Sequence, residues 1–406
     1  MSSNPIYRSY KYRLYPTKQQ AAYLNEVFGC VRFVWNQLVA NFNSWTSDGP
    51  NRPMNEKSLK DTPEYSWLAK TISYALQQKR MDFDEAKSQY FNKGRKKKPG
   101  RMKFKKKGIA RDSFRIPVAS MGGQKSIDLD NGAIKLPKMT TMKMVVDRKF
   151  MGTAKSVTVS MNRVDQFFVS ILVEEDVKVK TGVGRSIGID LGLNHLATLS
   201  NGVQIENPRW FRKSQAKLRK EQKHLSRKQR GSKRYERQRR KVARVHLKVA
   251  NQRSWAIHNL TTAIVNTFDT IMVEDLNVAG MKKLFGKSTS DAALGEILSQ
   301  LEYKSSWYGR TFHKINRWYP SSKTCNCCGH KMHTMTLDIR EWDCPNCGTH
   351  HDRDLNAAKN ILDEGLRDLY GFTSDELADY RRGEEVRHAS SGAFLDEAFS
   401  KFYNCL

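Results

Sequence analysis

Four cysteines near the C-terminal end of the sequence have the spacing of a metal site. They read Cys-x2-Cys, fifteen residues, Cys-x2-Cys, with a glycine after each pair: Cys325, Cys328, Cys344 and Cys347, then Gly329 and Gly348. This spacing is typical of a tetrahedral four-thiolate zinc site, and the glycines permit the tight turns around the ion. Such a site is closed, so we expect it to stabilise a fold and to do no chemistry. Cys327, inside the first turn, is expected to be a spare thiol.

Acidic residues stand where carboxylates from separate segments could meet. Asp190 ends a short apolar run in GIDLG, and Glu274 ends another in IMVE. In HDRDLNAAKNIL, which follows the cysteines, either Asp352 or Asp354 could cap the helix that begins there. Strand ends of one sheet can deliver oxygen ligands to a hard divalent cation. Either strand-ending acid alone is a weak signal, but the two together indicate a metal site.

The elements that must position these residues can be read from the apolar pattern. Residues 7–15 alternate like a strand and end at Pro16. From Thr17, which can cap a helix, apolar residues recur every three or four positions, and a second helix is expected over residues 68–91. We interpret both helices as parts of a bundle with a basic outer face.

A two-residue period follows. Two strand pairs are predicted: Ile127 and Leu129 with Ile134 and Leu136 across the turn dipeptide Asn131-Gly132, and residues 156–161 with 167–175. Residues 110–176 therefore predict a small antiparallel barrel or sandwich that the strand at 7–15 could join. Beyond a break at 180–185, the pattern predicts the strand that ends at Asp190 and then long helices over 210–268.

The chain is strongly basic. Across 406 residues, 71 Lys and Arg oppose 41 Asp and Glu, and the net charge of +30 attracts polyanions. Nineteen of the basic residues lie between Arg209 and Arg253. That region and the basic linker at 94–108 are either solvated or laid along phosphates. We favour phosphates for both, because so much like charge repels itself without a polyanion nearby. Nucleic acid is the expected partner.

Nothing in the sequence predicts secretion or membrane insertion. The N-terminal segment lacks a signal-like apolar stretch, and no run of about 18 apolar residues is present. We therefore expect a cytoplasmic, nucleoid-associated protein with no membrane partner. In that reducing compartment the cysteines point to metal rather than to disulfides.

In their order, GIDLG, VEDLN, the paired cysteines and HDRDLNAA resemble the TnpB family. These are RNA-guided nucleases encoded by bacterial and archaeal insertion sequences and related to type V CRISPR effectors. YRLYPTKQQ, GCVRFVWNQL and LEYKSSWYGRTFHKINRWYPSSKTC are similar to the same family, and the similarity covers residues 7–365. Trp255 departs from it, since relatives often carry an acid there, and nothing after Gly371 resembles the family.

The resemblance implies an α+β multidomain fold. Its parts are a RuvC-like (ribonuclease H-like) nuclease domain with an inserted zinc ribbon, and a wedge-type β-barrel interrupted by a helical recognition domain. The implied boundaries are 1–16 and 109–180 for the barrel, 17–108 for the helical domain with its basic linker, 181–323 and 348–370 for the nuclease and 324–347 for the ribbon. Residues 371–406 are left unassigned by the resemblance, and we expect them to form a mobile C-terminal tail.

The resemblance also assigns the site. Asp190, Glu274 and Asp354 become the catalytic, metal-binding acids, and Asp352 takes the supporting or capping role. Three carboxylates suit two Mg²⁺ or Mn²⁺ ions, which prefer oxygen ligands. The implied partners are a guide RNA derived from the transposon end and double-stranded target DNA, bound by a monomer with its RNA. Base pairing would specify the target, and the protein would read a short flanking motif.

Several function classes remain open at this point. An RNA-guided DNA endonuclease is the main hypothesis. A nuclease-inactive, RNA-guided repressor is disfavoured because all three acids are present. A DNA transposase or an RNA-processing enzyme on the same scaffold would carry the same acids, and a strand-transfer assay separates the transposase from the nuclease.

Overall fold

The computed structural model describes most of the chain. The described residues are 5–44, 54–92, 94, 102–108, 112–176, 184–336 and 338–389, with side chains as far as residue 383. They divide into two units, 1–176 and 177–406. Among the described residues, no helix is both long enough and apolar enough to cross a bilayer.

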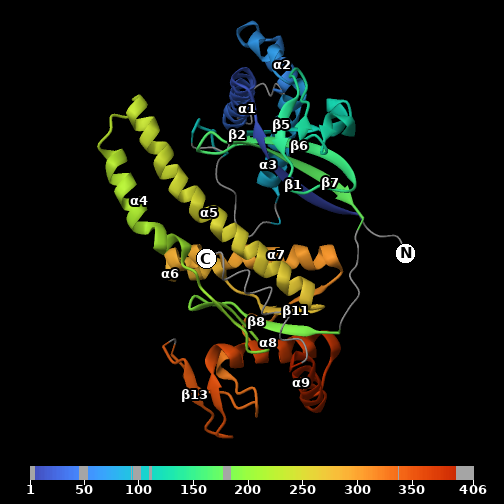
Figure 1. Cartoon of the computed structure of the whole chain (residues 1–406), viewed down its shortest axis with the longest axis vertical. Coiled ribbons are helices and arrows are strands. Elements are labelled where there is room, and N and C mark those ends of the chain that lie inside the picture. Colours follow the sequence, from blue (N-terminus) through green and yellow to red (C-terminus); the bar gives the residue numbers. More distant parts are fainter. Residues whose placement is uncertain are drawn as a thin grey trace. The chain divides into compact units, whose positions relative to one another are not determined.

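The first unit is built on one antiparallel sheet. Its strands are β1 (Ile6–Tyr15), β2 (Asp112–Pro117), β3 (Ile127–Asp128), β4 (Ala133–Ile134), β5 (Met142–Val145), β6 (Thr153–Met161) and β7 (Phe167–Glu175). The strand order is β2-β6-β7-β1-β5-β4-β3. The N-terminal strand therefore lies between two strands from much later in the sequence, as its alternation predicts (Figure 1).

Helices pack on this sheet through a shared apolar core. They are α1 (Lys18–Asn43), α2 (Glu56–Asp61), α3 (Ser73–Phe91) and the short 3-10 helices η1 (Pro63–Lys70) and η2 (Val118–Met121). A further 3-10 helix, η3 (Gln124–Ser126), has no buried residue. Thr17 caps α1 together with Gln20, as the sequence indicates. The second predicted helix begins at Ser73 rather than at residue 68, because buried, extended Thr71 and Ile72 separate it from η1.

The hairpin predicted across Asn131-Gly132 has a different turn. Ile127 does pair with Ile134, but the last paired residues are Asp128 and Ala133, so four residues form the turn. The Asp128 carboxylate accepts hydrogen bonds from the backbone amides of residues 130 and 131. This local capture of backbone donors explains why the two-residue turn does not form.

The basic linker lies partly outside the described residues. Its described end, residues 102–108, is attached to α1, since Asn36 exchanges hydrogen bonds with the backbone of Lys105. The Lys105 ammonium lies 3.8 Å from the ring centre of Trp35. Burial lowers the pKa of Lys105 to about 8. The sequence leads us to expect a linker that is solvated or laid along phosphates, whereas Lys105 packs against α1.

The second unit contains a five-stranded mixed sheet. Its strands are β8 (Ser186–Asp190), β9 (His195–Leu199), β10 (Gln204–Glu206), β11 (Thr270–Glu274) and β12 (Thr311–Ile315) in the order β10-β9-β8-β11-β12. Strands β8, β11 and β12 are parallel, and β9 and β10 are antiparallel to their neighbours. Three long segments of the sequence thus contribute neighbouring strands.

Helices cover both faces of this sheet. They are α4 (Trp210–Ser226), α5 (Lys233–Thr267), α6 (Val278–Ala292), α7 (Leu294–Tyr308), α8 (Arg353–Tyr370) and α9 (Ser374–Ala389). Ile187 and Ile189 share a core with α5 and α7, whereas Met272 packs against α8 on the opposite face (Figure 1). At Gly188 the approach of α8 is so close that a Cβ atom would lie 2.2 Å from the Ala358 carbonyl oxygen.

The described part of the C-terminal segment contains a helix. Residues 374–389 form α9, whereas the sequence suggests a mobile tail from residue 371. Leu377 is fully buried, and the Arg381 guanidinium donates to the Asn326 backbone carbonyl over 3.2 Å. The segment offers few apolar residues, so it has no helical stripe by which the sequence could reveal it.

Candidate active site and metal centre

The two strand-ending acids lie at the same edge of the sheet. Ile189 of β8 pairs in parallel register with Val273 of β11. The residues that follow, Asp190 and Glu274, therefore end neighbouring strands at their carboxyl ends. Ligands of parallel sheets commonly bind beyond this edge. The apolar residues before each acid fix it there, because they are buried between two helical layers.

Helix α8 brings the third acid. The Asp352 carboxylate caps the helix by accepting a hydrogen bond from the Leu355 amide at 2.8 Å. Asp354, in the first turn of α8, is not the capping residue, so its carboxylate can make other contacts. One of its oxygens lies 3.7 Å from His195 Nδ1, and the other lies 3.7 Å from an Arg340 nitrogen.

Asp190 is affected electrostatically by the other two acids. Burial, followed by the charges of Glu274 and Asp354, raises the pKa of Asp190 well above its usual range. Burial also raises the pKa of Glu274, and the Ser321 hydroxyl, which donates a hydrogen bond to its Oε1 atom, opposes this rise. Buried carboxylates that lie near one another are stabilised either by taking up a proton or by binding a cation.

The donor set of this site fits hard divalent cations. It offers carboxylate oxygens from two strand ends and one helix start, which Mg²⁺ and Mn²⁺ prefer. These oxygens come from separate parts of the chain, and the sheet and α8 hold them at one edge.

The four cysteines predicted to bind zinc converge. Their Sγ atoms all lie within 4.8 Å of one another, with 3.7 Å between Cys325 and Cys347 and 3.6 Å between Cys328 and Cys344. Zinc–sulfur bonds of about 2.3 Å at tetrahedral angles place sulfurs about 3.8 Å apart. The geometry therefore fits a single zinc ion. Cys327 is exposed and outside this group, as expected of a spare thiol.

Two equivalent turns present the thiolates. The Gly329 amide donates to the Cys325 carbonyl over 2.9 Å, and the Gly348 amide donates to the Cys344 carbonyl over 2.8 Å. Both glycines have positive φ, at 75° and 69°. Strands β13 (Glu341–Asp343) and β14 (His350–Asp352) then pair, and β14 leads directly into α8. We call residues 325–352, from the first cysteine to the end of β14, the cysteine unit. It ends where α8, the helix that carries Asp354, begins.

Sequence reasoning missed the residues that support this site. The segment between β12 and the first cysteine contains the 3-10 helix η4 (Ser321–Lys323) and places Ser321 against Glu274. Asn356 and Asn360 of α8 bind the backbone of the same segment. His195, at the start of β9, lies beside Asp354. Isolated Ser, Asn and His residues have no spacing signal, so only their contacts in the fold reveal them.

Comparison with known families gives three matches. Residues 168–284 match the OrfB family of the insertion sequence IS605, described as a probable transposase. Residues 295–361 match the TNB domain of Cas12f1-like proteins, and residues 1–49 match a helix-turn-helix domain. The first two matches span β8, β11, both cysteine pairs and the start of α8.

Individual relatives extend over almost the whole chain. A protein of Streptomyces pristinaespiralis, named as a candidate RNA-guided DNA endonuclease, is 38% identical over 372 residues, which are 89% of this chain and 90% of that protein. A protein of Escherichia coli K12 with the same designation is 32% identical, over 88% and 92% of the two chains. The structure of a Cas12f1–sgRNA–target DNA complex matches with 15% identity and a TM-score of 0.49, covering 88% of this chain and 99% of that one.

The length of these matches means that the similarity is not confined to one shared motif. The identities of 38% and 32% run across both structural units, and the family match places GIDLG and VEDLN in one segment. The chain therefore belongs to the TnpB family of insertion-sequence proteins.

Proposed function

We propose that this protein is an RNA-guided DNA endonuclease of an insertion sequence, in which Asp190, Glu274 and Asp354 hold two divalent cations. The observation that carries the proposal is the convergence of these acids: two end adjacent parallel strands, and the third begins the helix packed beneath them. Full-length similarity to proteins named as endonucleases of this kind supports it.

The protein's own carboxylates make the site favourable for cations. The charges of Glu274 and Asp354 add to burial in raising the pKa of Asp190, so a cation beside this carboxylate would be favoured. Bound Mg²⁺ or Mn²⁺ would supply activation of a water nucleophile and stabilisation of the leaving oxygen at a phosphodiester. The chain holds the carboxylates in place through the sheet, the α8 cap and the Ser321 hydroxyl.

A basic surface on α5 suits a nucleic-acid backbone. Its members recur every three or four residues on one side of the helix and are exposed: Arg234, Arg237, Lys241, Arg244 and Lys248. No hydrogen bond or ion pair to another described residue is seen for these five side chains. We call this set the α5 basic stripe. Neutralising phosphates would relieve the repulsion within it.

The first test is to purify the protein from cells that express its native locus and to sequence the bound RNA. We expect one abundant species with a constant structured part and a 3′ segment that matches DNA beside the element. Target DNA built from that segment should be cut in Mg²⁺ and left intact in EDTA. Only random fragments, or no RNA after a moderate-salt wash, would contradict the proposal.

A transposase is the second candidate, because the family that matches residues 168–284 is described as a probable transposase. The acids proposed here would serve either reaction, so the site alone does not separate them. A strand-transfer assay with labelled element ends does. Joined products would favour the transposase, whereas cutting that depends on a matching RNA would favour the endonuclease.

A further inference from the structure

Helix α8 carries a buried polar stripe. Asn356, Asn360 and Asp363 follow one another at four- and three-residue spacing, so they share one face of the helix. Their exposed fractions are only 2%, 2% and 4%. Burying polar side chains is costly unless they are hydrogen-bonded, and a buried network is stable only when its members find partners. The partners of this stripe therefore indicate its purpose.

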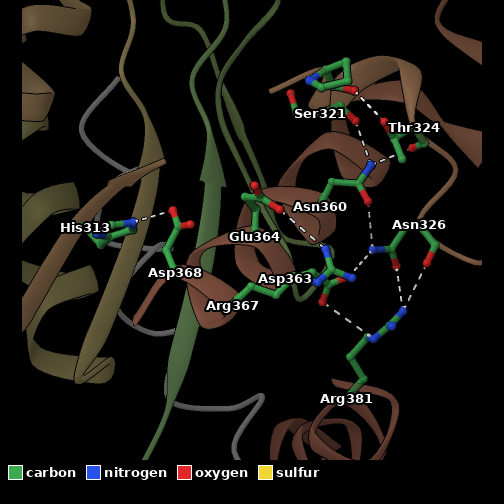
Figure 2. Close-up of polar contacts among 11 residues, drawn as sticks. His313, Ser321, Thr324, Asn326, Asn360, Asp363, Glu364, Arg367, Asp368 and Arg381 are labelled. Carbon is green, nitrogen blue, oxygen red and sulfur yellow. Dashed lines mark hydrogen bonds and ion pairs between the residues drawn. The ribbon is translucent and has the colours of Figure 1, made fainter. Parts of the chain in front are cut away.

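The stripe binds the backbone that leads into the cysteine unit. The Asn360 side-chain amide donates to the carbonyls of Ser321 at 2.7 Å and Thr324 at 2.6 Å (Figure 2). Asn356 donates to the Thr324 carbonyl at 2.8 Å and accepts a hydrogen bond from the Asn326 amide at 3.0 Å. The segment 321–326 is thus bound to α8 at Ser321, Thr324 and Asn326, on both sides of Cys325.

The same segment holds one of the proposed catalytic acids. Ser321 is 3% exposed, and its hydroxyl donates to Glu274 Oε1. The backbone carbonyl of Ser321 is held by Asn360, so both ends of this residue are engaged. Glu274 is consequently connected, through two successive hydrogen bonds, to the helix whose first turn contains Asp354.

A third element closes the network. The Asn326 side chain donates to Asp363 at 2.6 Å and to Asn360 at 3.1 Å, and it accepts from Arg381 of α9 at 3.2 Å (Figure 2). Arg381 Nε also lies 3.6 Å from Asp363. The start of the cysteine unit is therefore bonded to both α8 and α9.

We propose that Ser321 and Asn360 are positioning residues, which set the Glu274 carboxylate relative to Asp354 by linking β11 to α8. This inference rests on the proposed nuclease function. It assigns the Asn-rich face of α8 an indirect role in metal binding, since neither Ser321 nor Asn360 is itself a proposed metal ligand. It also explains how the closed cysteine unit contributes to catalysis: it anchors the far end of the segment that holds Glu274.

The test compares three single variants of the RNA-bound protein: Ser321→Ala, Asn360→Ala and, as the matched control, Ser322→Ala. The Mg²⁺ concentration that gives half-maximal target cleavage should rise about 10-fold or more in the first two and stay unchanged in the control, since losing a partner of a metal ligand typically costs 10–100-fold. Target binding in EDTA, zinc content and the unfolding midpoint should match those of the unmodified protein for Ser321→Ala.

Two further measurements keep the result independent of catalysis and of folding. In hydrogen exchange of the RNA-bound protein, peptides covering residues 321–326 should lose protection in Asn360→Ala and keep it in Ser322→Ala. The double variant Ser321→Ala/Asn360→Ala should lose no more activity than the worse single variant, because both act through one chain of contacts. The inference would be overturned if the activity losses of the two single variants multiplied in the double variant. It would also be overturned if the single variants kept both the Mg²⁺ dependence and the exchange protection of the wild-type protein. A wild-type complex that fails to cut would instead overturn the proposed function, and the exchange result would still stand.

Discussion

Asp190 and Glu274 end adjacent parallel strands of one sheet, and the charge of Glu274 helps to raise the pKa of Asp190. Strand pairing fixes this relationship, because the preceding residues Ile189 and Val273 lie directly opposite each other. Neither acid needs a flexible loop to reach the other. The site is consequently sensitive to whatever holds the sheet and α8 together, as well as to the acids themselves.

Replacing Asp190 by Asn should abolish cleavage and spare binding. Asn keeps the shape of the side chain but removes a negative charge from the proposed cation site, and several kcal/mol of charge stabilisation correspond to a rate loss of about 10³-fold. Cleavage rates and gel-shift affinities for RNA and target measure this. Asp368→Asn, which alters an α8 acid paired with His313 at 2.9 Å, is the control and should still cut. Parallel loss of binding in Asp190→Asn would show that Asp190 is structural.

Gly188→Ala should destabilise the second unit. The added Cβ atom would lie 2.2 Å from the Ala358 carbonyl and 2.6 Å from the Leu362 amide, so β8 and α8 would have to separate. We expect a loss of about 3 kcal/mol in unfolding free energy, at the upper end of overpacking effects. Denaturant titration measures it. In Gly295→Ala the nearest atom would be 3.8 Å away, so this control should change stability little. Equal stability of the two variants would contradict the close packing.

Zinc should be present at one ion per chain and should depend on the four-cysteine group. Cys344→Ser removes a buried ligand, and the metal content should fall to near zero because three thiolates no longer close the site. Elemental analysis of the purified protein gives the ratio directly. Cys327→Ser, which changes an exposed thiol in the neighbouring turn, should retain the ion. A folded, active and metal-free wild-type protein would remove zinc from this account.

The residues that could be predicted from sequence are those with a strong local signal. The cysteine spacing and the apolar runs before Asp190 and Glu274 each reflect a short-range constraint, and the structure brings each set together. The choice between Asp352 and Asp354 could not be made locally, since both precede the helix. The structure places Asp352 at the cap, as the resemblance suggests.

The residues that could not be predicted depend on tertiary packing. Asn356, Asn360 and Asp363 have the spacing of an ordinary solvent-facing stripe, and only the segment laid over them makes that stripe internal. Helix α9 has Leu377 as its one fully buried apolar anchor among its described side chains, which is too little for a periodic pattern. In both cases the information lies in a contact between distant segments.

Neutralising three residues of the α5 basic stripe should weaken binding and reduce its salt dependence. Each phosphate contact contributes about 0.7 to 0.9 to the slope of log affinity against log salt. The triple variant Arg237→Gln/Lys241→Gln/Arg244→Gln should therefore lower this slope by about 2 to 3. The decrease should be seen for RNA-bound protein binding target DNA if the stripe contacts DNA, and for free protein binding RNA if the stripe contacts RNA. Filter binding between 50 and 300 mM salt, about the range where such contacts dominate, measures it.

The control for this series is Lys314→Gln. Lys314 is already paired with Glu302 at 2.9 Å, so its loss should leave the slope unchanged. A triple variant with the wild-type slope for both nucleic acids would show that the stripe is merely solvated.

The buried Lys304 should make stability depend on pH. Its ammonium donates to the His258 carbonyl and to the hydroxyls of Thr261 and Thr262, yet burial lowers its pKa to about 8. Below pH 8 the side chain is charged in both folded and unfolded states, and its burial cost is fully present. Between pH 8 and 10.5 the folded protein releases the proton while the unfolded chain keeps it, so stability rises with pH in that window.

Lys304→Met removes this titration. Relative to the variant, the wild-type protein should gain up to about 3 kcal/mol of unfolding free energy between pH 7 and pH 10, because each pKa unit corresponds to about 1.4 kcal/mol. Denaturant titrations at the two pH values measure the difference and cancel the groups that both proteins share. Lys282→Met, at an exposed position of α6, should show no such divergence from wild type. If the unfolding free energy of Lys304→Met instead changes with pH as that of the wild-type protein does, Lys304 keeps its proton when buried. Its three hydrogen-bond acceptors then outweigh the cost of burying the charge.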